Sequence, residues 1–365
     1  MSIKNDGSQF ASSKGVPLSI AQQEVWREHA ISPGSAVHTV GAVTRLDGKL
    51  DPVLFETALA MLWDRHDALR LTPVLLNGAV EPVLVEAERP ARMMNFHDFS
   101  GHRDPSEFAE ELLKELGRQV ISLDGSETFR FDLIRLAPDK HIWSMCYHHI
   151  NMDAWANGIV VRDIAEAYTE LENGRKWEPA PCVSYADAIA GDARFSKSDR
   201  FLRNQEYWFE THQNLPDRYS ETSNDVLSSG SLSSTLLRRI SLDRSLIDRL
   251  MIVANEHNTT IARLFIAAII ILLHARSNAK DVVFGMPVLN RPTAREKATL
   301  GLFSLVVAPR VEILPDDELG PFLAKLDKAI RSALRHYRFP LSEISRHLGL
   351  ASKGILQLFD VSVSY

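Results

Sequence analysis

Two adjacent histidines, His148 and His149, followed by Asp153, are the residues of this chain best suited to chemistry. The ordinary pKa of an imidazole lies close to neutral pH, so a neutral histidine can take a proton from an amine or thiol nucleophile during group transfer. Neighbouring residues at the end of a strand point to opposite faces, so only one of the two can face a given reacting atom. The pattern predicts that one histidine is a base, while the other histidine and Asp153 hold the turn in shape.

Two other interpretations apply to such a pair. A histidine near the end of a strand is more often a hydrogen-bonded core residue than a catalyst. A metal site is less favoured, because the chain has no His-Glu-x-x-His helix and its two cysteines, Cys146 and Cys182, are not spaced as thiolate ligands. The rest of the sequence must show whether this pair contains a catalytic base or only core histidines.

The histidine pair lies where a strand is expected to pass into a helix. Residues 141–147 are rich in aromatic and β-favouring side chains, and apolar residues recur at helical spacing over 156–168. Residues 137–140 form the turn of a predicted hairpin that leads into the histidine strand. Further strands are expected at 38–46, 82–86 and 129–136, and helices at 52–64 and 106–119. Strands and helices interleaved in this way predict an α/β sandwich lobe that ends near residue 177.

A second lobe is expected after a linker that contains two prolines, at residues 177–182. A surface loop rich in Ser, Asn and Asp is expected at 216–234. The second lobe is predicted to begin with a strand at 235–240 and to continue with an apolar helix at 261–274 and a buried strand from 281. The predicted organisation is a first lobe at 16–177, a linker with a crossover helix and a mobile loop at 178–235, and a partial C-terminal lobe at 236–365.

Composition limits the class of protein. A chain of 365 residues with 45% hydrophobic content can build two cores, and a net charge of −6 argues against nucleic acid as a partner. The first fifteen residues lack the apolar core of a signal peptide, and the apolar run at 264–273 is too short to span a bilayer. We therefore expect a cytoplasmic protein whose two distant cysteines are reduced thiols.

The pattern His-His-x-x-x-Asp after an aromatic strand resembles the active-site motif of the condensation domains of nonribosomal peptide synthetases, within the chloramphenicol-acetyltransferase-like superfamily. Further stretches resemble motifs of this family in the same order: Ser19-x-Ala21-Gln22-x-x-x-Trp26, 65–70, 185–187, 204–208, 285–291, 336–341 and 359–365. The resemblance implies an α/β fold of two sandwich lobes that form a V with a channel between them. The second lobe would be incomplete, because the chain ends after about four fifths of the family pattern.

The resemblance also implies roles for individual residues. His149 would be the catalytic residue of the HHxxxD motif, with His148, Asp153 and Arg291 as structural support of the active site. Arg291 ends the stretch that resembles Gly-x-Pro-x-x-x-Arg, and it would pair with Asp153 across the two lobes. In the element at 65–70, Arg65 and Arg70 would hold internal structure rather than contact substrate.

Candidates for the lining of the channel are Ala154, Trp155, Asn157 and Leu305. Several positions depart from the family pattern, since Glu24-Val25 replaces Arg-Leu, Ala154 a glycine, Ala156 a serine and Leu305 an asparagine. Because Leu305 stands where the family has an asparagine, we assign no catalytic role to residues 300–306. A methyl group at Ala154, if it lines the channel, would narrow the path of the acceptor.

The activity implied is that of an acyltransferase, which forms an amide between a donor acyl thioester and the amine of a carrier-bound aminoacyl acceptor. The substrates would arrive on the phosphopantetheine arms of carrier proteins or as a CoA thioester, with no covalently bound cofactor. Because the first family motif begins at Ser19 of a chain that starts with Met, we expect the donor to arrive in trans. This favours a starter-type domain that N-acylates the first amino acid from acyl-CoA or acyl carrier protein.

Two alternatives remain open from the sequence. One is a peptide-extending condensation domain fed by a separate synthetase, and the other is a catalytically degenerate platform for carrier docking. An epimerisation domain shares the histidine motif, but residues 359–365 look more like the condensation form, and a heterocyclisation domain would have Asp in place of His148. The expected partners are carrier domains or acyl-CoA, with a downstream adenylation domain in the intact protein, in antibiotic or other secondary metabolite biosynthesis.

Overall fold

The computed structural model describes residues 15–31, 33–75, 82–123, 128–215, 237–353, 355 and 357–365. The chain forms two compact units, one made of residues 1–197 and 291–303 and the other of residues 198–290 and 304–365. The lobe boundary predicted near residue 177 lies inside the first unit, which also contains α5 (Tyr185–Phe195). The surface loop expected at 216–234 lies outside the described residues.

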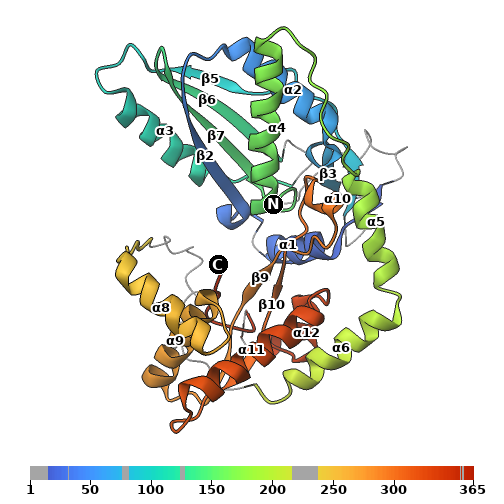
Figure 1. Ribbon diagram of the computed structural model, residues 1–365. Coiled ribbons are helices and arrows are strands. Elements are labelled where there is room, and N and C mark those ends of the chain that lie inside the picture. The colour runs from blue at the N-terminus through green and yellow to red at the C-terminus, as the bar shows by residue number, and fades with distance from the viewer. Residues whose placement is uncertain are drawn as a thin grey trace. The chain divides into compact units, whose positions relative to one another are not determined.

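The first unit is built on a four-stranded sheet in the order β2-β7-β6-β5 (Figure 1). Its strands are β2 (Thr39–Asp47), β5 (Asn95–Asp98), β6 (Phe129–Ala137) and β7 (Lys140–His148). The β6-β7 hairpin agrees with the sequence-based prediction, β2 pairs antiparallel with β7, and β5 runs parallel to β6.

Alternating side chains divide the two faces of this sheet between different helices. Phe131, Leu133 and Trp143 are buried in the large core together with α2 (Pro52–Arg65) and α4 (Ala154–Glu172). Ile134 and Ile142, on the opposite face, pack against α3 (Pro105–Arg118). A period of two along β6 and β7 thus determines which helix covers which face.

A smaller sheet and two helices complete the first unit. The sheet has the order β1-β4-β3, from β1 (Val16–Pro17), β3 (Leu71–Val74) and β4 (Val83–Glu86). The helices are α1 (Ile20–Ile31), which follows β1, and the short α10 (Ala294–Lys297) of the 291–303 segment.

The second unit is mainly helical among the described residues. Two strand pairs are present, β8 (Asp281–Val283) with β11 (Arg310–Glu312) and β9 (Met286–Val288) with β10 (Leu305–Val307). Its helices are α6 (Asp199–Thr211), α8 (Arg244–Glu256), α9 (Ile261–Ser277), α11 (Leu319–Arg335) and α12 (Leu341–His347).

Parts of the sequence-based description of the second unit were wrong. Residues 237–240, the described part of the strand predicted at 235–240, have no regular structure. The buried strand expected from 281 is interrupted at Gly285, whose missing side chain leaves room for the ring of Phe359. The stretch 359–365 forms a single bridge, between Ser362 and Gly285.

Within the described part of the chain, no single helix has the length and apolar character needed to cross a membrane. The helices α8 and α9 reach that length and apolar character only when counted together, and they are bent by 95° at their junction.

Candidate active site

The histidine pair lies at the junction of β7 and α4, as the sequence predicts. His148 is the last residue of β7, and α4 begins at Ala154. Asp153 is the N-cap of α4, since one of its carboxylate oxygens accepts the main-chain N–H of Ala156 at 3.0 Å. The turn of residues 149–153 is therefore held between a sheet strand and a capped helix.

His149 is half-buried, and its ring is fixed by one hydrogen bond. Nδ1 lies 2.8 Å from the carbonyl oxygen of Met152. A carbonyl can only accept, so Nδ1 carries the hydrogen and the lone pair of the neutral ring is on Nε2. Among the described residues, none is hydrogen-bonded to Nε2 of His149. The tautomer of His149 therefore leaves Nε2 as a hydrogen-bond acceptor.

His148 is held in the opposite way and is 1% exposed. Its Nδ1 accepts the main-chain N–H of Ile150 at 3.1 Å, so its hydrogen is on Nε2, which lies 3.3 Å from Nδ1 of His29. Burial, and then the neighbouring His29 and His38, lower the pKa of His148 to about 3. This ring is therefore neutral near pH 7, and both of its nitrogens face partners inside the protein.

His29 and His38 are members of this site that the sequence analysis did not identify. Their ring centroids lie 5.0 and 5.6 Å from that of His148. Burial lowers the pKa of His29, and burial together with His149 and His29 lowers the pKa of His38 to about 4. The three rings form a neutral cluster behind the turn. Within the described ranges, no three His, Cys, Asp or Glu side chains are placed to hold a metal ion.

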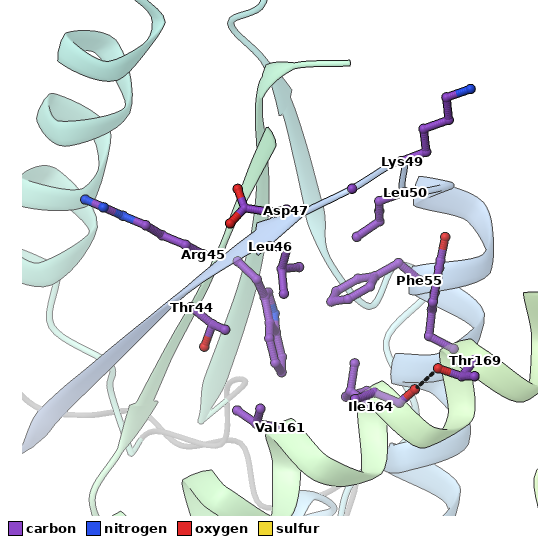
Figure 2. A pocket seen from close by; sticks show the side chains of 14 residues that line it. Thr44, Arg45, Leu46, Asp47, Lys49, Leu50, Phe55, Val161, Ile164 and Thr169 are labelled. Carbon is purple, nitrogen blue, oxygen red and sulfur yellow. Dashed lines mark hydrogen bonds between the residues drawn. The ribbon is translucent and has the colours of Figure 1, made fainter. Parts of the chain in front are cut away.

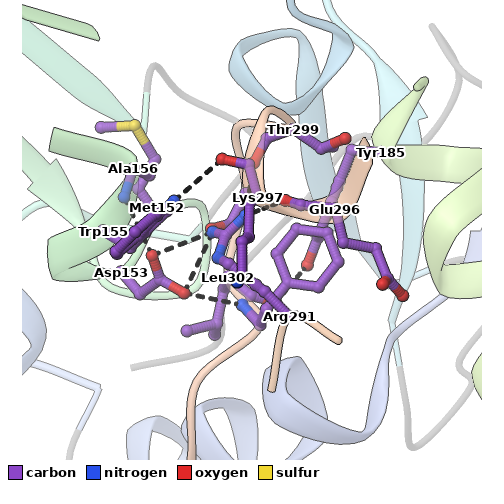
Figure 3. Close-up of polar contacts among 12 residues, drawn as sticks. Met152, Asp153, Trp155, Ala156, Tyr185, Arg291, Glu296, Lys297, Thr299 and Leu302 are labelled. Atoms are coloured by element: carbon purple, nitrogen blue, oxygen red, sulfur yellow. Dashed lines mark hydrogen bonds and ion pairs between the residues drawn. The ribbon is translucent and has the colours of Figure 1, made fainter. Parts of the chain in front are cut away.

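Asp153 and Arg291 form a buried ion pair (Figure 3). Nη2 of Arg291 lies 3.0 and 3.2 Å from the two carboxylate oxygens of Asp153. One of these oxygens also accepts the main-chain N–H of Phe303 at 3.0 Å. The predicted partner of Asp153 is thus correct, but the pair is not formed across two lobes, because Arg291 and the rest of the 291–303 segment belong to the first unit.

The guanidinium of Arg291 organises the 291–303 segment around itself. It donates to the carbonyl oxygens of Glu296 at 2.7 Å and Gly301 at 2.9 Å, and also to that of Thr299. It lies over the ring of Phe303, 4.1 Å from the centroid. Burial is the main influence on Arg291 and lowers its pKa, while Asp153 opposes this effect. The segment is therefore folded around one cation.

Gly301 and Tyr185 bring α5 into contact with this segment. The hydroxyl of Tyr185 donates to the carbonyl oxygen of Leu302 at 2.8 Å (Figure 3). Gly301 has a φ of +150°, and a Cβ at this position would lie 2.3 Å from a ring carbon of Tyr185. Only glycine fits here without movement of the ring.

The family-like motifs at 19–26 and 65–70 contact the same turn from other sides. The side-chain amide of Gln22 donates to the carbonyl oxygen of Ile150 at 3.0 Å. The amide of Asn151 donates to the carbonyl oxygens of Ala68 and Leu71 at 3.3 and 3.1 Å. Gln22 and Asn151 were both within motifs of the sequence analysis, but no site role was assigned to either.

Arg65 and Arg70 hold internal structure, as predicted. Nε of Arg65 donates to Asp163 at 3.0 Å, and Arg70 donates to the carbonyl oxygen of Trp63 at 2.7 Å. Asp67, in the same motif, accepts the main-chain N–H of Tyr185 at 2.8 Å and so helps to cap α5.

The four candidates for a channel lining differ in their surroundings. Ala154 is exposed and Asn157 is half-buried. Trp155 is 44% exposed, and its indole N–H donates to the carbonyl oxygen of Lys297 at 2.9 Å, which ties α4 to the 291–303 segment. Leu305 lies in β10 of the second unit with a buried side chain.

The chain is similar in sequence to known proteins along nearly its whole length. A family model described as Condensation domain matches residues 12–365. The chain is 26% identical over 351 residues to one of the subunits of plipastatin synthase from Bacillus subtilis (95% of this chain, 13% of the relative). It is 24% identical over 337 residues to isonitrile lipopeptide synthase of Streptomyces coeruleorubidus (92% and 22%). The chain thus spans less than a quarter of the length of these relatives.

Solved structures agree with the fold. The first condensation domain of the CDA synthetase superposes with a TM-score of 0.80 at 23% identity, covering 97% of this chain and 82% of that domain. A variant of the starter condensation domain of rhizomide synthetase, in complex with C8-CoA, superposes with a TM-score of 0.82 at 25% identity, covering 98% and 80%. The α/β fold expected from the sequence is therefore confirmed.

Proposed function

Because this chain belongs to the condensation-domain family of nonribosomal peptide synthetases, whose members form amide bonds, we propose that it transfers the acyl group of a donor thioester to the amine of a carrier-bound aminoacyl thioester. His149 is the base in this proposal. The observation that carries it is the hydrogen bond from Nδ1 of His149 to Met152, which leaves the lone pair on Nε2.

The bond changes can be followed atom by atom. The acceptor amine attacks the carbonyl carbon of the donor thioester, a C–N bond forms, and the carbon–sulfur bond then breaks. Nε2 of His149 takes the proton that the attacking nitrogen loses and returns it to the departing thiolate, so that amide and thiol are the products. General base catalysis of this kind contributes a factor of about 10² to 10⁴, and holding both substrates together contributes more.

His148, Asp153 and Arg291 act in this proposal by holding the turn. Asp153 accepts from Arg291 and from the N–H groups of Ala156 and Phe303, so its hydrogen bonds fix α4 and the 291–303 segment. His148 is buried, and burial lowers its pKa to about 3, so its ring is neutral near pH 7. Their replacement is expected to disturb His149 indirectly.

Within this reaction class we propose a starter-type role, in which acyl-CoA or an acyl carrier protein supplies the donor. The similarity to a starter condensation domain that was solved in complex with C8-CoA supports this choice. The partners in this proposal are an acceptor carrier domain and a downstream adenylation domain, in the cytoplasm.

Purified protein incubated with octanoyl-CoA and a panel of aminoacyl carrier proteins would test the proposal by mass spectrometry of the acylated carriers. We expect product with the wild type and a rate lower by about 10² to 10⁴ for His149→Ala. His102→Ala removes an exposed histidine and should leave the rate unchanged.

Two outcomes would contradict parts of the proposal. Product only from peptidyl carrier donors would replace the starter role with that of an extending domain. Carrier binding without product from any donor would contradict the enzymatic function and favour a docking platform.

A further inference from the structure

The turn that carries His149 is held by main-chain hydrogen bonds on both sides of that residue. The N–H of His149 donates to the carbonyl oxygen of His38 at 2.8 Å. The next N–H along the chain, that of Ile150, donates to Nδ1 of His148 at 3.1 Å. The two peptide groups that flank the α-carbon of His149 are therefore fixed, and with them the direction in which its side chain leaves the main chain.

Both polar main-chain groups of Ile150 lead to helix α1. The carbonyl oxygen accepts from the side-chain amide of Gln22 at 3.0 Å. The N–H leads to α1 through two imidazoles, because Nε2 of His148 lies 3.3 Å from Nδ1 of His29. The ring of His29 is stacked on that of Trp26, one turn earlier in the helix, with 5.9 Å between the ring centroids. One helix thus holds the turn at both polar groups of a single residue.

The contacts allow one placement of the hydrogens on these two imidazoles. Because a main-chain N–H can only donate, Nδ1 of His148 carries the lone pair and Nε2 carries the hydrogen. Nδ1 of His29 must then accept, which requires a neutral ring with its own hydrogen on Nε2. Burial lowers the pKa of His29, which favours the neutral ring. The other neutral form of His148 would place two donors against each other at Ile150 and two lone pairs against each other at His29.

A pocket in the first unit lies too far away to supply the acceptor that His29 provides. Figure 2 shows this pocket, and Thr44 is the residue of its lining that lies nearest to the start of β2. The strand begins at Thr39, which pairs with His148. Five residue steps along a strand correspond to roughly 17 Å, at about 3.3 Å for each. A molecule in the pocket therefore does not reach the ring of His148.

We propose that His29 is a positioning residue for the reaction at His149. It accepts the hydrogen of His148 and so keeps the lone pair on Nδ1 of that ring, which holds the N–H of Ile150 and the turn. The part of this inference that concerns catalysis rests on the proposed function, whereas the part that concerns the hydrogen bonds does not. Loss of the acceptor should loosen the turn without removing the base.

Two substitutions of His29 separate the hydrogen bond from the volume of the ring. His29→Leu fills much of the space of the imidazole but leaves the N–H of His148 buried without its acceptor. His29→Asn places an amide oxygen close to the position of Nδ1, where it can accept the same hydrogen. Circular dichroism would confirm that each variant is folded.

Long-range proton–nitrogen correlation spectra of protein with nitrogen-labelled histidine show which ring nitrogen carries the hydrogen. The spectrum of His148→Gln would identify the signals of His148. We expect the hydrogen of His148 on Nε2 in the wild type and in His29→Asn, and a second tautomer in His29→Leu. Hydrogen exchange at the amide of Ile150 should be faster in His29→Leu by about tenfold or more, because its acceptor is no longer held in one form.

His38→Leu is the matched control for the tautomer. His29 and His38 are each 6% exposed, and the ring centroid of His38 lies 5.6 Å from that of His148. Nε2 of His38 has no hydrogen-bond partner among the described residues. The same substitution at this second ring should therefore leave the hydrogen of His148 on Nε2.

The kinetic test uses octanoyl-CoA and an aminoacyl carrier protein that the wild type acylates. We expect kcat of His29→Leu to fall by about tenfold or more, because a small displacement of a reacting group is costly. The KM for octanoyl-CoA should stay within about twofold of the wild type, since the donor site is not changed. His29→Asn should recover most of the lost kcat, which a loss of ring volume alone would not explain.

The proposal is overturned if His29→Leu keeps the wild-type tautomer of His148 and the wild-type exchange of Ile150, or if His38→Leu changes the tautomer as much as His29→Leu does. It is also overturned if His29→Leu loosens the turn while kcat stays at the wild-type value. A wild type that forms no amide from any donor would instead contradict the proposed function. The spectra and the exchange rates would then still decide whether His29 holds the turn.

Discussion

Asp153 and Arg291 are 138 residues apart in the sequence, yet their side chains form a buried ion pair with oxygen–nitrogen distances of 3.0 and 3.2 Å. Asp153 belongs to the turn that carries His149, and Arg291 holds three carbonyl oxygens of the 291–303 segment. The pair therefore joins the candidate catalytic turn to a distant part of the chain within one compact unit.

Arg291→Ala should lower the free energy of unfolding by about 3 to 5 kcal/mol, because it leaves the carboxylate of Asp153 buried without its cation. Arg291→Lys should restore only part of this loss, since one ammonium cannot reproduce the planar fork that reaches Asp153 and the carbonyl oxygens. Urea unfolding followed by fluorescence measures both changes.

The control for this prediction is Arg244→Ala. Arg244 also pairs with an acidic residue, Asp248, at 2.8 Å, but its side chain is 83% exposed, so its loss should have little effect. An unfolding free energy of Arg291→Ala within about 1 kcal/mol of the wild type would contradict a structural role for the pair.

Local patterns in the sequence were sufficient to predict the surroundings of His149. The hairpin of β6 and β7 follows from β-favouring residues on both sides of a short turn, and α4 follows from apolar residues at helical spacing. The period of two in a strand also predicts that the two histidines differ in burial, and His148 is buried whereas His149 is half-buried. These signals are local, so they are visible before the fold is known.

The contacts that complete the site are long-range and carry no local signal. The 291–303 segment belongs to the first unit, where Arg291 pairs with the buried carboxylate of Asp153. The sequence of this segment resembles an ordinary turn and does not reveal that contact. His29 reaches His148 from α1 and His38 from the residue before β2, and single histidines at such positions are common in proteins. The Asp153–Arg291 pair was predicted from the resemblance to a family. The spacing of the two residues in the sequence could not have predicted it.

The histidine cluster should make stability depend on pH. Burial holds the pKa of His148 at about 3, below the value of about 6.5 in the unfolded chain, so only the unfolded chain binds this proton between those values. The resulting stability is fully present above about pH 6.5 and is lost as the pH falls towards 3, by up to about 1.4 kcal/mol for each pH unit. Unfolding measured from about pH 7 to about pH 4 should show this slope.

His148→Gln should reduce that slope by about one proton, because glutamine does not titrate. His102→Gln, at an exposed histidine, controls for the removal of an imidazole elsewhere. Equal slopes for His148→Gln and the wild type would show that His148 does not contribute to the pH dependence.

Gly301→Ala should lower the free energy of unfolding by about 1 to 3 kcal/mol. Its φ of +150° is strained for any L-residue, and its Cβ would collide with the ring of Tyr185. Gly117→Ala is the matched control, because a Cβ there meets nothing within 4 Å inside α3, and alanine should stabilise the helix by roughly 0.5 to 1 kcal/mol. The two alanine variants should therefore shift the thermal midpoint in opposite directions.

Gln22 should control the position of His149 through Ile150, separately from its effect on α1. Its Oε1 accepts the main-chain N–H of Ser19 at 3.0 Å, while its Nε2 donates to the carbonyl oxygen of Ile150 at 3.0 Å. Gln22→Glu keeps the first contact but places an acceptor against the second carbonyl, so the turn must shift. A misplacement of about 1 Å at a reacting group can cost about 10²-fold in rate, so we expect kcat for amide formation to fall at least tenfold. Ser19→Ala removes the reciprocal cap of α1 but not the contact to Ile150, and it should lower stability with kcat nearly unchanged. If the two variants lost kcat equally, Gln22 would be a helix cap without a role in positioning His149.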